Sequence, residues 1–341
     1  GGLHGGPAER PAWAAPVTRV CEPLGGFYAW ADLLAARGLP SPPSTGLMVG
    51  GRRGYRAHLL PGTGDRVTAA AGVVEAVRAA TGDGADGAAV AMYLDDTDVA
   101  AFRAAGVTAP PVLLTLDAEL PLPADGWDGY LAGLSRGRRH AVRTDARRFA
   151  ESGLTVEHRP ATECATEVGR LMAATEARYG HYADPVGLAA AFARQAAAMA
   201  DVATVLLCRD EDGVATGFCL YYVWGDSLFV RAAGFDYTAG RGVGEYFELV
   251  FRRPILDAHE RGLRRVHLGI EAAGAKALRG ARLHGLWMLD LAAHSALHGH
   301  DHAVATTNST VVADLVATSP AIGRALGPDV APLLPGGAEA W

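Results

Sequence analysis

The feature that most constrains this chain is the regular alternation of strand-like and helix-like segments in its second half. Short apolar runs bounded by glycine or acidic turns predict strands, and longer stretches with apolar residues every three or four positions predict helices. The predicted strands cover residues 154–158, 202–209, 214–224, 227–235, 264–270 and 284–292, and the predicted helices cover residues 162–179, 185–200, 244–261 and the segment around Lys276. The order β-α-α-β-β-β-α-β-α-β predicts an α/β fold with a mixed central sheet flanked by helices.

The first half of the chain also mixes helices and strands. We expect helices at residues 27–37 and 66–80, strands at 88–94 and 111–116, and a hairpin of 46–49 with 55–60. Asp95, Asp96 and Asp98 follow the strand predicted at 88–94. Three carboxylates could form a metal site, but Asp directly before a helical segment is favoured as an N-cap. We therefore expect caps for a short helix ending at Gly106, and no metal site.

A change of composition divides the chain. Residues 120–126 are rich in proline and glycine and are the best linker candidate. A long arginine-rich helix is expected from about Trp127 to Ser152, ended by Gly153. We therefore predict an N-terminal domain at 1–126, a connecting basic helix at 127–152 and a C-terminal domain at 153–341.

Composition excludes several classes of protein. The 341 residues are 50% hydrophobic and 20% charged, which is typical of a globular chain with two cores of ordinary size. No apolar run reaches the ~18 residues of a membrane span, and the first residues lack the apolar core of a signal peptide. None of the four cysteines forms a CxxC pair, so a reducing cytoplasm is expected. The arginine-rich, lysine-poor composition suggests a bacterial source.

A glycine-rich turn precedes the predicted helix 244–261. Gly240, Gly242 and Gly244 would let backbone N–H groups approach an anion, and the positive end of a helix dipole favours negative charge there. The alternative is a turn that binds no ligand.

These residues carry a family resemblance. The order of elements, the glycine turn and residues 246–265 and 275–281 resemble the GCN5-related N-acetyltransferase (GNAT) fold and its Fem-type, peptidoglycan-biosynthesis relatives, which have two such domains in tandem. The arginine-rich segment with Tyr130 to Leu134 resembles the helix that leads into those domains. The resemblance covers about 200 residues. It implies tandem GNAT-like domains, of which the first is degenerate, and an acyltransferase that forms an amide from an activated donor and an amine acceptor.

The resemblance also implies a donor site. The family pattern Arg/Gln-x-x-Gly-x-Gly/Ala places the pyrophosphate of coenzyme A on the turn. Gly242 and Gly244 match it, whereas Ala239 stands at the first position. Arg241 could supply the missing charge. The expected donor-binding residues are Arg241, Gly242, Val243 and Gly244, with acyl-coenzyme A as the donor.

Amide formation needs a base, stabilisation of the oxyanion, and alignment of the two reactants. The candidate bases are Glu248, Glu271 and Asp236, although each could instead be a cap or a surface charge. Tyr179 and Tyr182, in the turn between the first two helices, and Tyr222, in a predicted strand, are candidates for acceptor binding.

Lys276 is the only lysine in the sequence, although lysine and arginine together number 31. Arg279 lies three residues later on the same helical face. Arginine is a planar fork and lysine a compact charge, so the choice of lysine suggests contact with a charged substrate group. A solvated helix is the alternative.

Other basic residues suggest a different donor. A net charge of −6 argues against general nucleic-acid binding. The basic helix nevertheless contains Arg136, Arg139, Arg143 and Arg147, which could contact the phosphates of an aminoacyl-tRNA, the donor of Fem-type enzymes. A non-catalytic scaffold is the third hypothesis. His267 is expected to be a core residue, and His294, His298, His300 and His302 to be surface residues.

Overall fold

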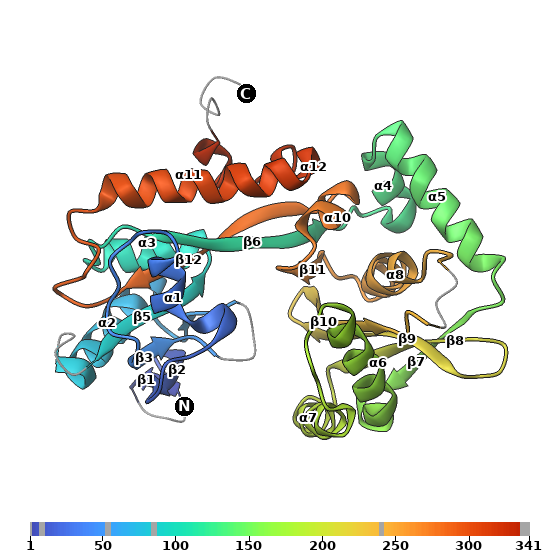
Figure 1. Ribbon diagram of the computed structural model, residues 1–341, viewed down its shortest axis with the longest axis horizontal. Helices are drawn as coiled ribbons and strands as arrows, with labels where there is room; N and C mark the ends of the chain where they lie inside the picture. Colours follow the sequence, from blue (N-terminus) through green and yellow to red (C-terminus); the bar gives the residue numbers. More distant parts are fainter. Residues whose placement is uncertain (1, 7–10, 52–55, 83–86, 239–241, 335–341) are drawn as a thin grey trace. The chain divides into compact units, whose positions relative to one another are not determined.

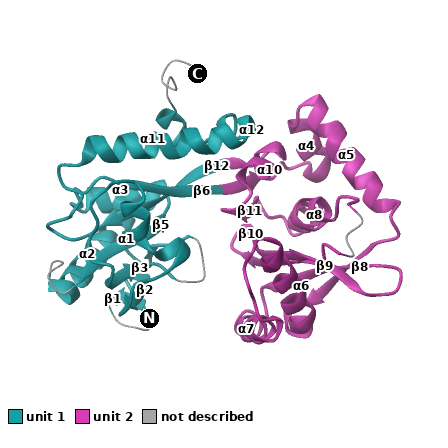
Figure 2. Cartoon of the chain, in the orientation of Figure 1, with its two compact units in different colours: residues 1–117, 283–341 teal, residues 118–282 magenta. Residues whose placement is uncertain are grey.

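The computed structural model describes residues 2–6, 11–51, 56–82, 87–238 and 242–334. The chain forms two compact units, of residues 1–117 with 283–341 (unit 1) and of residues 118–282 (unit 2), shown in Figure 2. This division differs from the predicted domains because the end of the chain returns to unit 1. There β12 (Arg282–Asp290) pairs antiparallel with β5 (Ala88–Leu94). Pairing between segments so distant in the chain leaves no local pattern in the sequence.

Unit 1 has the strand order β1-β2-β3-β5-β12-β6, with β4 paired to β2. Its remaining strands are β1 (Gly2–Gly5), β2 (Trp13–Val20), β3 (Gly46–Val49), β4 (Leu60–Pro61) and the first part of β6 (Val112–Pro121). Its helices are η1 (Gly26–Tyr28), α1 (Trp30–Ala35), α2 (Arg66–Thr81), α3 (Asp96–Ala104), α11 (Asp301–Thr318), α12 (Pro320–Gly323) and η5 (Ala331–Leu333). Their places in the chain can be followed in Figure 1.

The predicted hairpin of residues 46–49 and 55–60 is wrong. β3 instead pairs antiparallel with β2 and parallel with β5, over Gly46↔Ala88 to Val49↔Ala91. A parallel pair requires a crossover connection, which α2 supplies. Asp65 caps α2 by accepting a hydrogen bond from the Thr68 amide, and Gly82 ends it in the left-handed conformation. Long-range pairing thus outweighed the local turn signal of the glycines at 50–54.

A segment of unit 1 lies beside the end of β5. The Ala57 amide donates to the Tyr93 carbonyl (3.0 Å), and the Leu59 amide donates to Asp98 Oδ2 (3.1 Å). The side chains of Ala57 and Leu59 are buried in the same apolar cluster as α2 and β5. Residues 57–59 therefore occupy the space next to the carboxyl end of this parallel pair.

Unit 2 has the strand order β11-β10-β9-β8-β7, and the end of β6, residues 118–121, pairs with β11. Its strands are β7 (Thr155–Pro160), β8 (Ala203–Arg209), β9 (Ala215–Trp224), β10 (Ser227–Phe235) and β11 (Arg265–Gly269). Its helices are α4 (Gly126–Gly133), α5 (Arg136–Ala150), η3 (Ala161–Glu163), α6 (Ala165–Arg178), α7 (Pro185–Ala198), α8 (Glu245–Phe247), the π-helix η4 (Glu248–Arg252), α9 (Arg253–Glu260) and α10 (Ala273–Leu278).

Alternate residues of β9 face opposite sides of the unit 2 sheet. Phe218 and Leu220 are buried in an apolar cluster with side chains of α6 and α7. Tyr221 faces the other way, and its hydroxyl donates to Asp257 of α9 (2.8 Å). The helices α6 and α7 therefore cover one face, and the helical segment from α8 to α9 covers the other (Figure 1).

Strands β10 and β11 pair in parallel over only three residues, from Ser227↔Arg265 to Phe229↔His267. Beyond them β10 continues to Phe235 along β9, with an irregularity in register between Val230 and Ala232. Beyond Phe229, β10 and β11 are not paired with each other. Such divergence of parallel strands makes space at their carboxyl ends.

Two predicted helices are interrupted. The helix expected at 127–152 is divided into α4 and α5, because Leu134 has an extended backbone (φ −85°, ψ 148°). The helix expected at 244–261 begins at Glu245 and contains the π-helix η4. A π-helical turn inserts one residue and often lies near a functional site.

Candidate functional site

Unit 2 contains a pocket of about 500 Å³, here called the unit 2 pocket. It lies where β10 ends and α8 and α10 begin. Its lining residues are Tyr179, Thr216, Phe235, Asp236, Tyr237, Gly242, Glu245, Tyr246, Ala272 and Ala275. This size is in the usual range of small-molecule sites. Of the residues selected from the sequence, Tyr179, Asp236 and Gly242 line it.

Asp236 is fixed at the end of β10. Its Oδ2 accepts from Arg170 Nη1 (3.1 Å), and its Oδ1 accepts from the amide and hydroxyl of Thr238 (3.0 and 2.6 Å). The Asp236 amide donates to the Thr216 carbonyl across the sheet (2.9 Å). These contacts orient a carboxylate on the pocket wall.

The glycine turn is closed by a side chain of the chain itself. The Val243 amide donates to Glu245 Oε2 (2.9 Å). Gly242 and Gly244 have positive φ (66° and 97°), so both positions favour glycine. A Cβ at Gly244 would also lie 3.3 Å from the Asp145 carbonyl oxygen of α5. The turn is therefore specified by backbone conformation and packing. The Glu245 carboxylate already accepts a hydrogen bond from one of its amides.

Tyrosines form much of the remaining wall. Tyr179 is 70% exposed, Tyr237 46% and Tyr246 36%, so their rings present accessible surface. Desolvation raises the pKa of Tyr246 to about 12, against the opposing effect of the Arg279 charge. Desolvation also raises the pKa of Tyr237. Both hydroxyls are therefore neutral at physiological pH and act as hydrogen-bonding groups.

The turn between β11 and α10 forms another part of the wall. Ala272 has left-handed backbone angles (φ 54°, ψ 40°), which are unusual for a residue with a Cβ. Lys276 is buried (4% exposed), and its Nζ donates to the Gly269 carbonyl (2.9 Å). Lys276 thus joins the helix to the start of the turn that carries Ala272. The contact of Lys276 with a charged substrate group, expected from the sequence, stays a prediction.

Arg279 lies behind the pocket. Its guanidinium bonds Asp145 of α5 (3.3 Å) and lies over the rings of Phe247 and Phe251, 5.3 and 5.7 Å from their centroids. The predicted neighbour of Lys276 therefore stabilises the helix α8 and η4 against α5, and it does not line the pocket.

The other predicted bases lie elsewhere. The Glu248 carboxylate is buried (1% exposed), and its Oε1 accepts from Arg252 (2.7 Å) and Arg253 (2.6 Å). Two cations hold it, and it is not among the described residues that line the pocket. Glu271 is exposed and directly precedes the lining residue Ala272.

Two predicted acceptor-binding tyrosines are not in the pocket wall. Tyr182 is 95% exposed in the turn before α7. Tyr222 lies on β9 and packs against the α6 and α7 cluster, where desolvation raises its pKa. Arg241, the predicted donor-binding arginine, lies outside the described residues.

One face of α5 is basic. Arg136, His140, Arg143 and Arg147 are exposed and spaced four, three and four residues apart, which places them on one side of a helix. No ion pair involves them within the described part of the chain. Arg139 differs, because its Nη2 donates to the carbonyls of Ala132 (3.2 Å) and Leu134 (3.0 Å) at the end of α4. We call the four exposed residues the α5 basic stripe.

A cluster of possible metal ligands in unit 1 offers less chemistry than the unit 2 pocket. His58, Asp95 and Asp98 have side-chain atoms within 4.8 Å of one another, as in a metal site. However, Asp95 is bonded to Arg56 and Asp98 to Arg66, which already supply positive charge. Asp95 also caps α3 by accepting from the Asp98 amide (2.8 Å), so the predicted capping role is confirmed.

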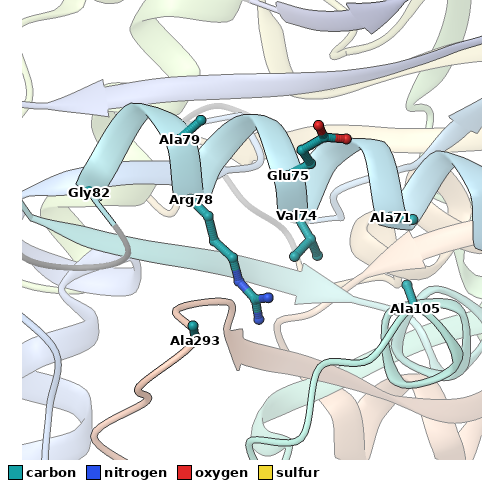
Figure 3. Close-up of a pocket in the computed structure, with 8 residues that line it drawn as sticks. All are labelled: Ala71, Val74, Glu75, Arg78, Ala79, Gly82, Ala105 and Ala293. Carbon is teal, nitrogen blue, oxygen red and sulfur yellow. The ribbon is translucent and has the colours of Figure 1, made fainter.

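A shallow groove of about 530 Å³ lies along α2 (Figure 3). Alanines dominate its wall, and Glu75 and Arg78 supply the charges. Arg78 points across the groove, and its Nε donates to the Leu291 carbonyl (2.7 Å). Because the Arg78 guanidinium is bonded to the main chain, few groups in this groove remain to orient a ligand. The unit 2 pocket is the stronger candidate.

Sequence reasoning missed most of the pocket wall. Phe235, Tyr237, Glu245 and Tyr246 flank the glycine turn directly in the chain, and this adjacency was the available signal. Thr216, Ala272 and Ala275 come from other elements and have no distinguishing side-chain chemistry. Only the tertiary fold brings them together.

No protein-family model matches the chain, and no curated protein matches its sequence. The crystal structure of FemX matches with a TM-score of 0.54 at 13% identity, over 85% of this chain and 87% of that one. The C-terminal domain of a protein described as a lysylphosphatidylglycerol synthetase, from Agrobacterium fabrum, matches with a TM-score of 0.51 at 16% identity, over 85% and 93%.

The fold of this chain resembles that of FemX. The α/β fold class and the resemblance predicted from the sequence are confirmed at the level of fold. A tandem GNAT protein from the clavulanic acid biosynthesis pathway also matches, with a TM-score of 0.41 at 16% identity, over 82% and 100%. In the described part of the chain, no helix combines the length and apolar character needed to span a membrane.

Proposed function

We propose that unit 2 is an acyltransferase domain that forms an amide by transferring an acyl group from an activated donor to an amine. The observation that carries this proposal is the short β10–β11 pairing, which ends after three residues beside the pocket of about 500 Å³. Pockets at the carboxyl ends of diverging parallel strands are the usual ligand sites of open α/β sheets. The resemblance to the fold of FemX supports the same position.

The pocket offers groups for amide formation. Asp236 lines it and Glu271 adjoins it, so these two carboxylates are the proposed proton acceptors for the attacking amine. Glu248 is a weaker candidate because two arginines bind its carboxylate. Neutral tyrosine hydroxyls, such as that of Tyr246, could donate to a developing oxyanion.

For the donor, we propose an aminoacyl-tRNA, as the resemblance to Fem-type enzymes implies. The α5 basic stripe supports it, because four exposed basic side chains on one helix face suit a phosphate backbone. The same helix packs against the glycine turn, where a Cβ at Gly244 would approach the Asp145 carbonyl oxygen at 3.3 Å. Acyl-coenzyme A is the second candidate, and the glycine turn with Gly242 and Gly244 favours it.

A donor panel tests the function. Purified protein is incubated with acyl-coenzyme A or charged tRNA and a set of amines, and amide products are detected by mass spectrometry. Product that depends on charged tRNA supports the leading proposal, and product that depends on acyl-coenzyme A supports the second. Absence of product with every donor, together with no copurifying donor, would favour a non-catalytic scaffold.

A charge variant tests the α5 basic stripe. Arg143→Gln removes one exposed charge and should weaken tRNA binding, with a salt slope smaller by about one ion. Arg194→Gln, which removes an exposed charge from α7, is the matched control and should leave the slope unchanged. Equal slopes for both variants would remove the stripe from the proposal.

A further inference from the structure

Aromatic rings supply much of the unit 2 pocket wall. Four of its ten described lining residues are aromatic, namely Tyr179, Phe235, Tyr237 and Tyr246, and two more are Ala272 and Ala275. Aromatic side chains offer large apolar faces with few rotatable bonds. A pocket of about 500 Å³ with such a wall suits an apolar group of a ligand.

The rings are held in place by contacts with one another and with the core. Phe235, at the end of β10, has its ring centroid 5.9 Å from that of Tyr246 and 6.4 Å from that of Tyr237. The Tyr246 ring meets Phe251 in a T-shaped pair at 5.8 Å, and Phe251 is fully buried. Tilted and edge-to-face pairs at such distances are favourable. This packing pre-organises the aromatic wall of the pocket.

The carboxylates in the wall have partners within the protein. Asp236 accepts hydrogen bonds from Arg170 (3.1 Å) and from the Thr238 hydroxyl (2.6 Å). Glu245 accepts one from the Val243 amide (2.9 Å). An uncharged side chain can therefore be buried beside these carboxylates without removing their partners, and burial of a polar group is costly only when it lacks a partner.

Two alanines leave room in the pocket. Ala272 and Ala275, at the start of α10, bring only methyl groups to the wall. A larger side chain at Ala275 would take up volume that is now open to a ligand. The small residue at this position therefore limits the size of the group that the pocket can hold.

We propose that the unit 2 pocket binds an uncharged aromatic or bulky apolar side chain of a substrate and that Ala275 sets the size limit of that side chain. The inference deepens the proposed function and rests on it, because the side chain belongs either to the transferred acyl group or to the acceptor amine. The rings of Phe235, Tyr237 and Tyr246 pack on this side chain, and burial of its apolar surface favours binding.

Calorimetric titration of the full chain with N-acetyl-L-phenylalanine methyl ester tests the proposal without any donor. This probe should bind saturably and at least about tenfold more tightly than N-acetyl-L-alanine methyl ester, which differs from it only in lacking the ring. It should also bind more tightly than Nα-acetyl-L-lysine methyl ester, whose long side chain ends in a charge.

Two variants test the wall itself. Ala275→Leu fills part of the pocket with a residue that helices accept well, and should weaken binding of the phenylalanine ester about tenfold or more. Ala190→Leu makes the same change at an exposed residue of α7 and is the matched control, which should bind as the wild type does. Tyr237→Ala removes a ring that is 46% exposed and should weaken binding about threefold or more.

Two further probes identify the substrate that carries the side chain. L-phenylalanine methyl ester places the ring near an ester carbonyl, as an activated donor does, whereas 2-phenylethylamine joins it to an amine alone, as an acceptor does. Displacement of the first probe by either compound supports the proposal, and the tighter of the two assigns the side chain to donor or acceptor. Displacement by neither would overturn the proposal.

The proposal is also overturned if the alanine ester or the lysine ester binds as tightly as the phenylalanine ester, or if folded Ala275→Leu binds the phenylalanine ester as the wild type does. If Ala275→Leu does not fold, unchanged binding by Tyr237→Ala overturns it instead. Because these are binding measurements, a failed donor panel with intact selectivity for the ring would reject only the proposed function. Amide formation without that selectivity would reject only the inference.

Discussion

The parallel strand pairs of the two units end in different ways. In unit 1, β3 and β5 pair over four residues, and residues 57–59 then lie beside the end of β5 with Leu59 buried. In unit 2, β10 and β11 pair over three residues, and a pocket of about 500 Å³ lies where β10 ends. A similar arrangement of strands thus supports a filled core in one unit and a space of ligand size in the other.

The difference shows two ways to stabilise such a strand end. In unit 1 the apolar side chains of Ala57 and Leu59 fill the site and gain close packing. In unit 2 an open pocket forgoes that packing, and buried polar contacts fix the elements around it. Lys276 Nζ donates to the Gly269 carbonyl, and the Tyr130 hydroxyl donates to the Arg279 carbonyl (3.0 Å). The proposed site therefore lies in unit 2, beside the open strand end.

The largest expected effect concerns residues 57–59, which fill the end of the parallel strand pair in unit 1. Leu59→Ala should lower the free energy of unfolding by about 2–4 kcal/mol, because Leu59 is 2% exposed and its removal leaves a cavity. Leu60→Ala, at a neighbouring residue that is 56% exposed, should change it by less than ~0.5 kcal/mol. Urea unfolding measures both. Equal effects would mean that residues 57–59 do not fill a core in unit 1.

The next effect concerns the polar contact of Lys276. Lys276→Met keeps the length of the side chain but removes the bond to the Gly269 carbonyl, and should cost about 1–3 kcal/mol of unfolding free energy. Lys276→Arg should also be less stable than the wild type, because a guanidinium is wider than an ammonium and the site is buried. If Lys276→Met instead left the melting temperature unchanged and lowered only kcat/KM for amide formation, Lys276 would act on substrate, as the sequence suggested.

A smaller and pH-dependent effect is expected at Tyr130. Desolvation raises the pKa of Tyr130 to about 12, above its ordinary value of 10.0. The unfolded chain therefore loses this proton first, so the stability that Tyr130 contributes is complete below about pH 10 and is lost as the pH rises through about 12. Tyr130→Phe should cost about 1 kcal/mol near neutral pH.

The difference between wild type and Tyr130→Phe should shrink between about pH 10 and about pH 12, measured by chemical unfolding at each pH. Tyr182→Phe is the control, since Tyr182 is 95% exposed and should show no such trend. A constant difference for Tyr130→Phe would mean that its hydroxyl is not desolvated.

The smallest effect concerns the backbone of the pocket wall. Ala272→Gly should raise stability by about 0.5–1 kcal/mol, because a Cβ is disfavoured at φ 54°. Ala273→Gly, at the next residue and inside α10, should lower stability by a similar amount. Thermal unfolding of the two variants distinguishes them. A loss of stability in both would show that the turn is not strained.

Local patterns predicted much of unit 2. The strands expected at 202–209, 214–224 and 227–235 correspond to β8, β9 and β10 within a residue or so, and the helix pair corresponds to α6 and α7. These elements are bounded by strong turn residues, such as Gly213 and Gly225, both with positive φ. Periodicity and turn chemistry were sufficient there because neighbouring elements in the chain pair with each other.

Long-range pairing accounts for most of the errors. The end of β12 pairs with Val90 and Ala91 in unit 1, and β3 pairs with β2 and β5 where a hairpin was expected. The burial of Lys276 likewise depends on the Gly269 carbonyl, seven residues earlier, and on the packing around the lysine side chain. Local sequence does not indicate this burial, because lysine is usually exposed. Of the candidate site, the glycine turn and Asp236 could be found from sequence, whereas Ala272 and Ala275 could not.

The isolation of Lys276 has a practical consequence for measuring unfolding. A protease specific for lysine has one cleavage site in these 341 residues, and in the folded chain that site is 4% exposed. Cleavage therefore requires local opening of α10 or unfolding of unit 2, so its rate reports the population of the open form. Loss of the full-length band on a gel would follow the stability of the pocket wall. A ligand that closes the pocket should slow that loss, with no label attached to the protein.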